Sequence, residues 1–122
     1  MPRVCFLYNH LAPHQVFHTA PVAFALSCQD PDVEVEIAAS CDHQLAMAGR
    51  IGAGWPEHAV RFRRMEPPFL EGCLRAAGLP SWHPGKRRNL RANRRYLATL
   101  DAIVVPERTS VALRDHPELD HV

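Results

Sequence analysis

Lysine is nearly missing from this sequence, because Lys86 is the only lysine among the 14 basic residues. Thirteen acidic residues balance the basic ones and leave a formal net charge of +1. A chain with so little net charge has no overall field that would attract a polyanion. The composition therefore argues against nucleic acid as a partner.

Long apolar runs and paired cysteines are also missing. No segment reaches the roughly 20 apolar residues that span a bilayer, and no basic leader followed by an apolar stretch marks a signal peptide. Cys5, Cys28, Cys41 and Cys73 form no CxxC pair, and Cys5 and Cys28 lie in apolar runs. We therefore expect free, buried thiols and a cytoplasmic protein, with the inner-membrane surface as a peripheral location.

Glycine-rich nucleotide loops are the third absence. The sequence has neither the dinucleotide fingerprint GxGxxG nor the phosphate loop GxxxxGK[ST], and its first long loop contains no glycine. No GxSxG motif marks a hydrolase nucleophile either. We therefore expect no bound cofactor.

What the sequence does contain is an alternation of strand and helix patterns. Apolar or alternating runs predict strands, and runs of helix formers between them predict helices. The order of these elements is typical of a parallel sheet that is covered by helices on both faces. The predicted strands are 4–8, 33–39, 59–65 and 101–105, and the predicted helices are 22–28, 43–51, 69–77 and 87–100.

Local signals set the expected ends of these elements. We expect Thr19 to cap the first helix with Pro21 in its first turn, and Asp42 to cap the second helix. In the third strand we expect Val60 and Phe62 to point inward and the arginines outward.

The predicted fold is a Rossmann-like three-layer α/β/α domain over residues 1–122, with strand order 3-2-1-4. The last residues, "LDHV", read as the approach to a fifth strand. We therefore expect the chain to be the N-terminal half of a larger two-domain protein.

The loops after strands one and four should meet, because ligands of open parallel sheets bind beyond the carboxyl ends of the strands. His10, His14 and His18 follow the first strand at a spacing of four. A zinc site is disfavoured, because Pro13 and Pro21 should interrupt a helix across the three histidines. The alternatives are loop histidines with local hydrogen bonds, or histidines that act on a ligand.

We take His14 as the candidate general base because it lies mid-loop, and Glu107 as a residue that orients a histidine or accepts a proton. His18 and Thr19 are placed to contact an anion at the helix start. For Glu107 and Arg108 a surface ion pair, and for Thr109 a helix cap, are the competing interpretations. The remaining predicted substrate-binding residues are Asn9, His10, Gln15, Arg108 and Thr109.

Six of the 14 basic residues fall in "GKRRNLRANRRY" at 85–96. One side of the predicted helix, opposite Leu90 and Leu97, carries Arg87, Arg88, Arg91, Arg94 and Arg95. This side is either a solvated helix face or a contact for an anionic membrane surface, a phosphorylated polymer or, less favoured by the net charge, nucleic acid.

The stretch "HQVFHTAPVAFALS", together with "DVEVEIAAS" and "LDAIVVPERTS", resembles the N-terminal half of GT-B type bacterial glycosyltransferases and of CDP-glycerol glycerophosphotransferases. The resemblance implies an acceptor-side domain that binds a sugar or polyol-phosphate acceptor during cell-envelope biosynthesis. It also implies that a missing C-terminal domain binds the nucleotide-activated donor, that His14 matches the base position, and that no metal is needed. The alternative is a stand-alone domain that binds a nucleotide or phosphorylated metabolite without catalysis.

Overall fold

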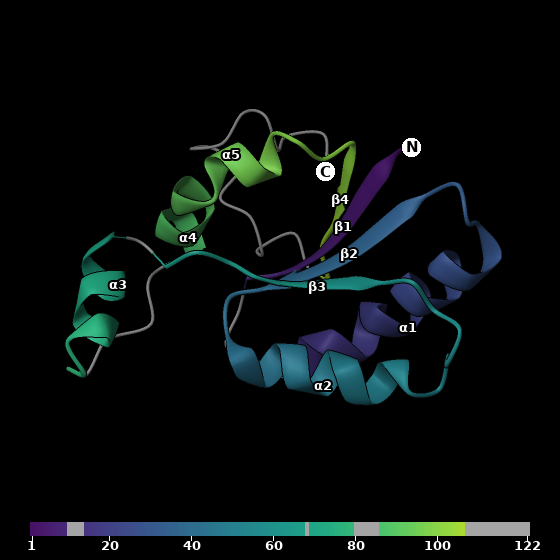
Figure 1. Cartoon of the computed structure of the whole chain (residues 1–122), viewed down its shortest axis with the longest axis horizontal. Coiled ribbons are helices and arrows are strands. Elements are labelled where there is room, and N and C mark those ends of the chain that lie inside the picture. Colours follow the sequence, from purple (N-terminus) through teal and green to yellow (C-terminus); the bar gives the residue numbers. More distant parts are fainter. Residues whose placement is uncertain (10–13, 68, 80–85, 107–122) are drawn as a thin grey trace.

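Four parallel strands form the central layer of the protein (Figure 1). The computed structural model describes residues 1–9, 14–67, 69–79 and 86–106. The strands are β1 (Arg3–Tyr8), β2 (Glu34–Ala39), β3 (Arg61–Arg64) and β4 (Ala102–Val104). They pair in the order β3-β2-β1-β4, with every pair parallel. The predicted strand order is therefore confirmed.

Helices cover both faces of this sheet (Figure 1). On one face lie α1 (His14–Gln29) and α2 (Asp42–Gly52), and on the other lie α4 (Lys86–Ala92) and α5 (Arg94–Leu97). A further helix, α3 (Phe69–Ala76), stands apart beyond the ends of the strands (Figure 1). The predicted three-layer, Rossmann-like arrangement is thereby confirmed.

The central strand β1 separates two apolar cores. Phe6 and Tyr8 pack with α1 on one face, and Cys5 and Leu7 pack with α4 and α5 on the other. All four side chains are buried. A continuous apolar run is what a strand covered on both sides requires, because both sets of alternating side chains face a helix layer.

The first helix begins earlier than its sequence predicts. α1 starts at His14 and contains Pro21, so Thr19 is not its cap and Pro21 is not in its first turn. The buried residues Val16, Ala20 and Phe24 repeat along one face of this helix. Packing of this face against the sheet offsets the hydrogen bond that Pro21 cannot donate, a cost of about 3 kcal/mol in helix interiors.

A further local prediction, the cap of the second helix, is wrong. Cys41, not Asp42, is the N-cap of α2, and the Asp42 carboxylate accepts a hydrogen bond from Arg64 Nε at 3.1 Å. Val60 is buried as predicted, but Phe62 is 42% exposed. Phe62 still points inward as predicted, because its ring centre lies 6.1 Å from that of the buried Phe24 on α1. It stays partly exposed because β3 is an edge strand.

The predicted helix over 87–100 is divided in two at Asn93, which has φ −105° and ψ 16°. Its apolar face is nevertheless where the periodicity put it, because Leu90 and Leu97 are buried and Leu100 is partly buried against the same core. The interruption has a cause in the side chain of Asn93, which bonds to the segment after β3.

The third predicted helix is confirmed, and so is the glycine that was expected to stop it. Gly78 has φ 71°, a left-handed conformation that glycine adopts without steric cost, and it lies two residues after the end of α3 at Ala76. The thiols are all free, but only Cys5 is fully buried, whereas Cys28 and Cys73 are exposed. The expectation of a buried Cys28 is wrong because this residue lies on the outer side of α1.

Candidate functional site

The carboxyl-terminal edge of the sheet is the first candidate region. The order β3-β2-β1-β4 places the topological switch point between β1 and β4, and open α/β sheets bind ligands at that point. Asn9 directly follows β1 and is fully buried. Its Oδ1 accepts a hydrogen bond of 3.1 Å from Nδ2 of Asn89, which is buried on α4. This amide pair ties the α4 layer to the end of the central strand.

The predicted substrate-binding residues near the start of α1 are spread over its first two turns. His14 and Gln15 form its first turn, and their side chains lie outside the described part of the structure. His18 is exposed one turn later, so it is not at the helix start as predicted. Thr19 faces inward, and its hydroxyl lies 2.6 Å from the Tyr8 hydroxyl.

The contact between Thr19 and Tyr8 belongs to the core. Burial raises the pKa of the Tyr8 hydroxyl to about 12, and the hydrogen bond with Thr19 only partly opposes this effect. Tyr8 is therefore neutral at physiological pH. Thr19 is half-buried on the second turn of α1, where its hydroxyl bonds to Tyr8 and does not lie at the helix start.

The remaining members of the predicted set lie outside the described residues. They are His10 in the first loop, and Glu107, Arg108 and Thr109 after β4. The meeting of these two loops stays a prediction that follows from the strand order.

Pro21 does not break the helix that carries His14 and His18, contrary to the expectation that argued against a zinc site. α1 runs through Pro21 without interruption, so His14 and His18 do lie one turn apart on the same helix. Within residues 1–9, 14–67, 69–79 and 86–106, no group of three or more His, Cys, Asp or Glu residues is arranged to hold a metal ion.

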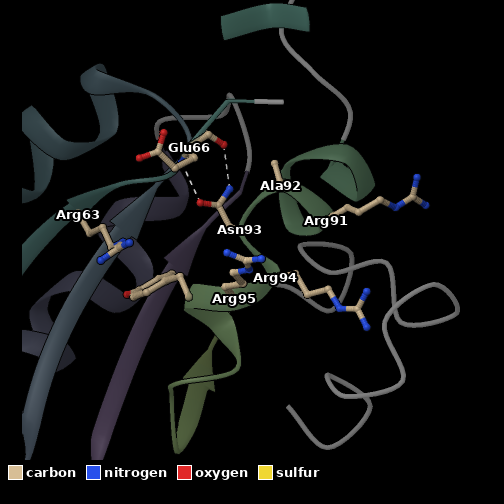
Figure 2. Close-up of a pocket in the computed structure, with 8 residues that line it drawn as sticks. Arg63, Glu66, Arg91, Ala92, Asn93, Arg94 and Arg95 are labelled. Carbon is tan, nitrogen blue, oxygen red and sulfur yellow. Dashed lines mark hydrogen bonds between the residues drawn. The ribbon is translucent and has the colours of Figure 1, made fainter. Parts of the chain in front are cut away.

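A second candidate region is an open pocket of about 470 Å³ between β3 and α5 (Figure 2). It combines residues that are about 30 positions apart in the sequence, because Arg63 lies on β3 and the other cations on α4 and α5. Arg87, which is predicted for the same basic face, has its side chain outside the described part. The lining residues are Arg63, Glu66, Arg91, Ala92, Asn93, Arg94, Arg95 and Tyr96.

Tyr96 forms the inner wall of this pocket. The Arg63 guanidinium carbon lies 3.9 Å from the centre of the Tyr96 ring, which is a cation–π contact. The Tyr96 hydroxyl donates to Glu36 Oε2 at 3.2 Å and lies 3.6 Å from Cys5 Sγ. Burial, followed by the charges and hydrogen bonds of Cys5 and Glu36, raises the Tyr96 pKa strongly. The ring therefore remains a neutral and fixed platform for Arg63.

Asn93 holds the opposite wall. Its Oδ1 accepts from the Glu66 amide at 2.8 Å, and its Nδ2 donates to the Glu66 carbonyl at 2.9 Å. Nδ2 also donates to the Asn89 carbonyl at 2.7 Å. Asn93 is 3% exposed. One buried amide therefore fixes the segment after β3 against the junction of α4 and α5.

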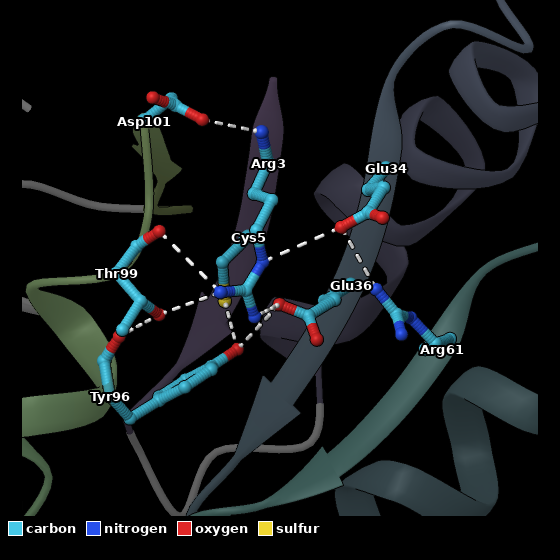
Figure 3. A network of polar contacts seen from close by, with 8 residues as sticks. All are labelled: Arg3, Cys5, Glu34, Glu36, Arg61, Tyr96, Thr99 and Asp101. Carbon is cyan, nitrogen blue, oxygen red and sulfur yellow. Dashed lines mark hydrogen bonds and ion pairs between the residues drawn. The ribbon is translucent and has the colours of Figure 1, made fainter. Parts of the chain in front are cut away.

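The arginines of the pocket differ from Arg3, Arg61 and Arg64, which pair with carboxylates. At the amino-terminal ends of the strands, Arg3 pairs with Glu36 at 3.1 Å, and Arg61 pairs with Glu34 at 3.0 Å (Figure 3). Arg3 also donates to the Thr99 hydroxyl, and its backbone amide donates to Asp101. This network is structural, since it links β1, β2, β3 and the start of β4.

By contrast, no carboxylate among the described residues forms an ion pair with the four arginines of the pocket, Arg63, Arg91, Arg94 and Arg95. All four are exposed. Their positive charge is therefore available to an anion.

Sequence reasoning found the basic residues of 86–95 but missed Arg63, Asn93 and Tyr96 as parts of one site. The alternation in "RFRR" does place Arg63 opposite Phe62. Nothing in the sequence shows that β3 and α5 are neighbours, because that contact depends on how the second helix layer packs on the sheet.

None of the helices in the described ranges is both long and apolar enough to cross a membrane. Compared with protein-family models, curated proteins and solved structures, the chain matches none of them.

Proposed function

We propose that the chain is the acceptor-side domain of a GT-B type glycosyl or glycerophosphate transferase. The observation that carries this proposal is the beginning of α1 beside the switch point of a parallel 3-2-1-4 sheet. The free N–H groups and the positive dipole end of a 16-residue helix favour an anionic group at that position. A phosphorylated polyol or sugar acceptor carries such a group.

The proposed chemistry uses His14 as general base. It would take the proton from an acceptor hydroxyl while the acceptor oxygen attacks the donor and the nucleotide leaves. His18, exposed on the next turn of α1, would contact the acceptor. The donor and the stabilisation of its leaving group would come from a domain outside these 122 residues. Asn9 would act as a positioning residue, since its buried side chain ties the end of β1 to Asn89.

A second candidate function is supported by the same helix end. A nucleotide or a phosphorylated metabolite would fit the start of α1 without any catalysis, because helix N-termini at switch points bind phosphate in many binding domains. The two functions differ in their ligand. The transferase domain should bind the acceptor and not the nucleotide.

NMR titration of the isotope-labelled chain separates these functions. We expect glycerol 3-phosphate to cause saturable shifts at the amides of Asn9, Val16 and His18, and CMP to cause none. Saturable shifts with CMP would favour the binding domain and contradict the transferase. Absence of saturable shifts at this edge with both compounds would overturn both functions.

Matched histidine variants test the site itself. His14→Ala and His18→Ala should each weaken glycerol 3-phosphate binding about tenfold, the size expected for one charge-assisted contact. His43→Ala is the control, because His43 is exposed in the first turn of α2, beside the neighbouring strand end. An equal loss in all three variants would show a general charge effect and contradict the assigned contacts.

A further inference from the structure

We propose that the pocket between β3 and α5 is a binding site for a phosphate group, with Arg63 and Arg95 as its direct ligands. The site is separate from the proposed acceptor site at the start of α1 and shares no residue with it. The inference therefore stands whether or not the transferase proposal does.

The pocket concentrates positive charge that no described carboxylate pairs with. Four guanidinium groups line one pocket together with a single carboxylate, Glu66. Like charges that line one pocket repel one another, and an anion between them reduces that repulsion. The arginines that hold the fold together, Arg3, Arg61 and Arg64, each have a carboxylate partner. Like the exposed Arg50 and Arg75, the pocket arginines form no ion pair with a described carboxylate, but four of them are gathered around one pocket.

The Arg63 guanidinium is held in place before any ligand binds. Arg63 rests on the Tyr96 ring at 3.9 Å, and Tyr96 is buried and held by Glu36. Asn93 fixes the opposite wall through two hydrogen bonds to the Glu66 backbone. A cation that is already held in place loses less side-chain entropy when it binds its ligand. Arg63 is thereby held in place, unlike the arginines of a solvated helix face, which are free to move.

The chemistry of the pocket favours phosphate among the possible anions. Guanidinium groups present parallel N–H donors that match the oxygens of phosphate. The volume of about 470 Å³ is larger than a phosphate group and falls in the range of small-molecule pockets, so there is room for an organic part of the ligand. In Figure 2, Arg91 and Arg94 extend away from Arg63. Arg63 and Arg95 would then hold the phosphate, and Arg91 and Arg94 would face what is attached to it.

Two sources of this phosphate are chemically equivalent, a soluble phosphate compound and the headgroup of an anionic lipid. The test therefore has two arms with the full chain. In one arm inorganic phosphate is titrated at low ionic strength, and the arginine Nε–Hε signals are followed by NMR. In the other arm the chain is sedimented with vesicles of phosphatidylcholine that contain phosphatidic acid.

We expect saturable shifts at Arg63 and Arg95, and about a tenfold loss of affinity in Arg63→Gln and Arg95→Gln. Arg50→Gln is the matched control, since Arg50 is an exposed arginine at the end of α2 on the opposite face of the sheet. Its affinity should stay within about twofold of the parent, because distant exposed charges are screened by salt. If Arg63→Gln does not fold, Arg95→Gln alone tests the site, because Arg95 is exposed on α5 and its replacement should not disturb folding.

Each outcome decides the proposal. Phosphate binding that both variants lose supports a soluble ligand, and vesicle binding alone that both variants lose supports a lipid headgroup. No saturable binding in either arm overturns the site. Equal weakening by Arg50→Gln, or vesicle binding that depends on Arg91 and Arg94 but not on Arg63 and Arg95, also overturns it, because either result indicates general surface charge.

Discussion

Gly52 illustrates how a single residue is constrained by the packing around it. A Cβ at this position would lie 2.7 Å from Cζ and 2.8 Å from Cε1 of Phe24, and 3.1 Å from His58 Nε2. Phe24 is fully buried and in ring contact with Trp55 and His58. It therefore has little room to move. Gly49 lies three residues earlier on the same helix, and a Cβ there would meet no heavy atom within 4 Å.

We predict opposite effects for alanine at these two positions. Gly52→Ala should lower the free energy of unfolding by about 1–3 kcal/mol, because the new methyl group overpacks the core at Phe24. Gly49→Ala should raise it by about 0.5–1 kcal/mol, because alanine loses less backbone entropy in a helix. Urea denaturation followed by circular dichroism measures both values. Equal effects would contradict the close contact between α2 and Phe24.

At the scale of elements, Asn93 decides how the second helix layer joins the sheet. Its amide bridges the backbone of Glu66 and interrupts the helix that the periodicity of 87–100 predicts. The interruption separates α4, which contacts the end of β1 through Asn89, from α5, which places Tyr96 beside Cys5 and Glu36. The Arg63 platform therefore depends on a side-chain contact between distant segments.

We predict that Asn93→Ala destabilises the protein by about 1–3 kcal/mol, because it leaves polar backbone groups of Glu66 without a partner. Asn93→Asp should also destabilise it, since a carboxylate can accept from the Glu66 amide but cannot donate to its carbonyl. Chemical denaturation gives both values. The NMR signal of the Arg63 side chain should shift as well, and an unchanged signal would contradict the role of Asn93 in shaping the pocket.

At the scale of the whole molecule, weak acids are buried on both faces of the sheet. Burial raises the pKa of the Cys5 thiol from 9.0 to about 11 and that of the Tyr8 hydroxyl from 10.0 to about 12. It raises the pKa of Tyr96 still further. In each case the folded state holds the proton more tightly than the unfolded state does. This linkage stabilises the protein fully below about pH 9 and is lost as the pH rises.

We predict that the free energy of unfolding falls by on the order of 2–4 kcal/mol between pH 8 and pH 11. Urea denaturation at constant ionic strength measures this change. Cys5→Ala should reduce the slope between pH 9 and pH 11, because it removes one of the linked groups. Cys28→Ala is the control, since Cys28 is exposed, and its slope should match that of the parent. A stability that does not change above pH 9 would contradict the buried state of these acids.

The fold could be predicted to the level of strand order because the signals are local. β1 is a short apolar run, β2 alternates before it becomes apolar, and helix patterns separate the strands, so a parallel sheet with right-handed connections follows. Helix ends were predicted less well. At Thr19 and Pro21 the local cap signal is real, but packing of the apolar face of α1 outweighs it. The candidate site was predicted in part, because its histidines and the arginines of 86–95 are visible in the sequence.

By itself, the sequence determined the elements, their order and the apolar faces that they bury, since these depend on residue type and on periods of 2 and 3.6 residues. Only the tertiary structure decided that Arg63 stacks on Tyr96, that Asn93 binds Glu66 and that Thr19 faces Tyr8. The physical reason is that these contacts join segments far apart in the chain. Their geometry depends on how the helix layers pack on the sheet, and no local sequence pattern encodes this packing.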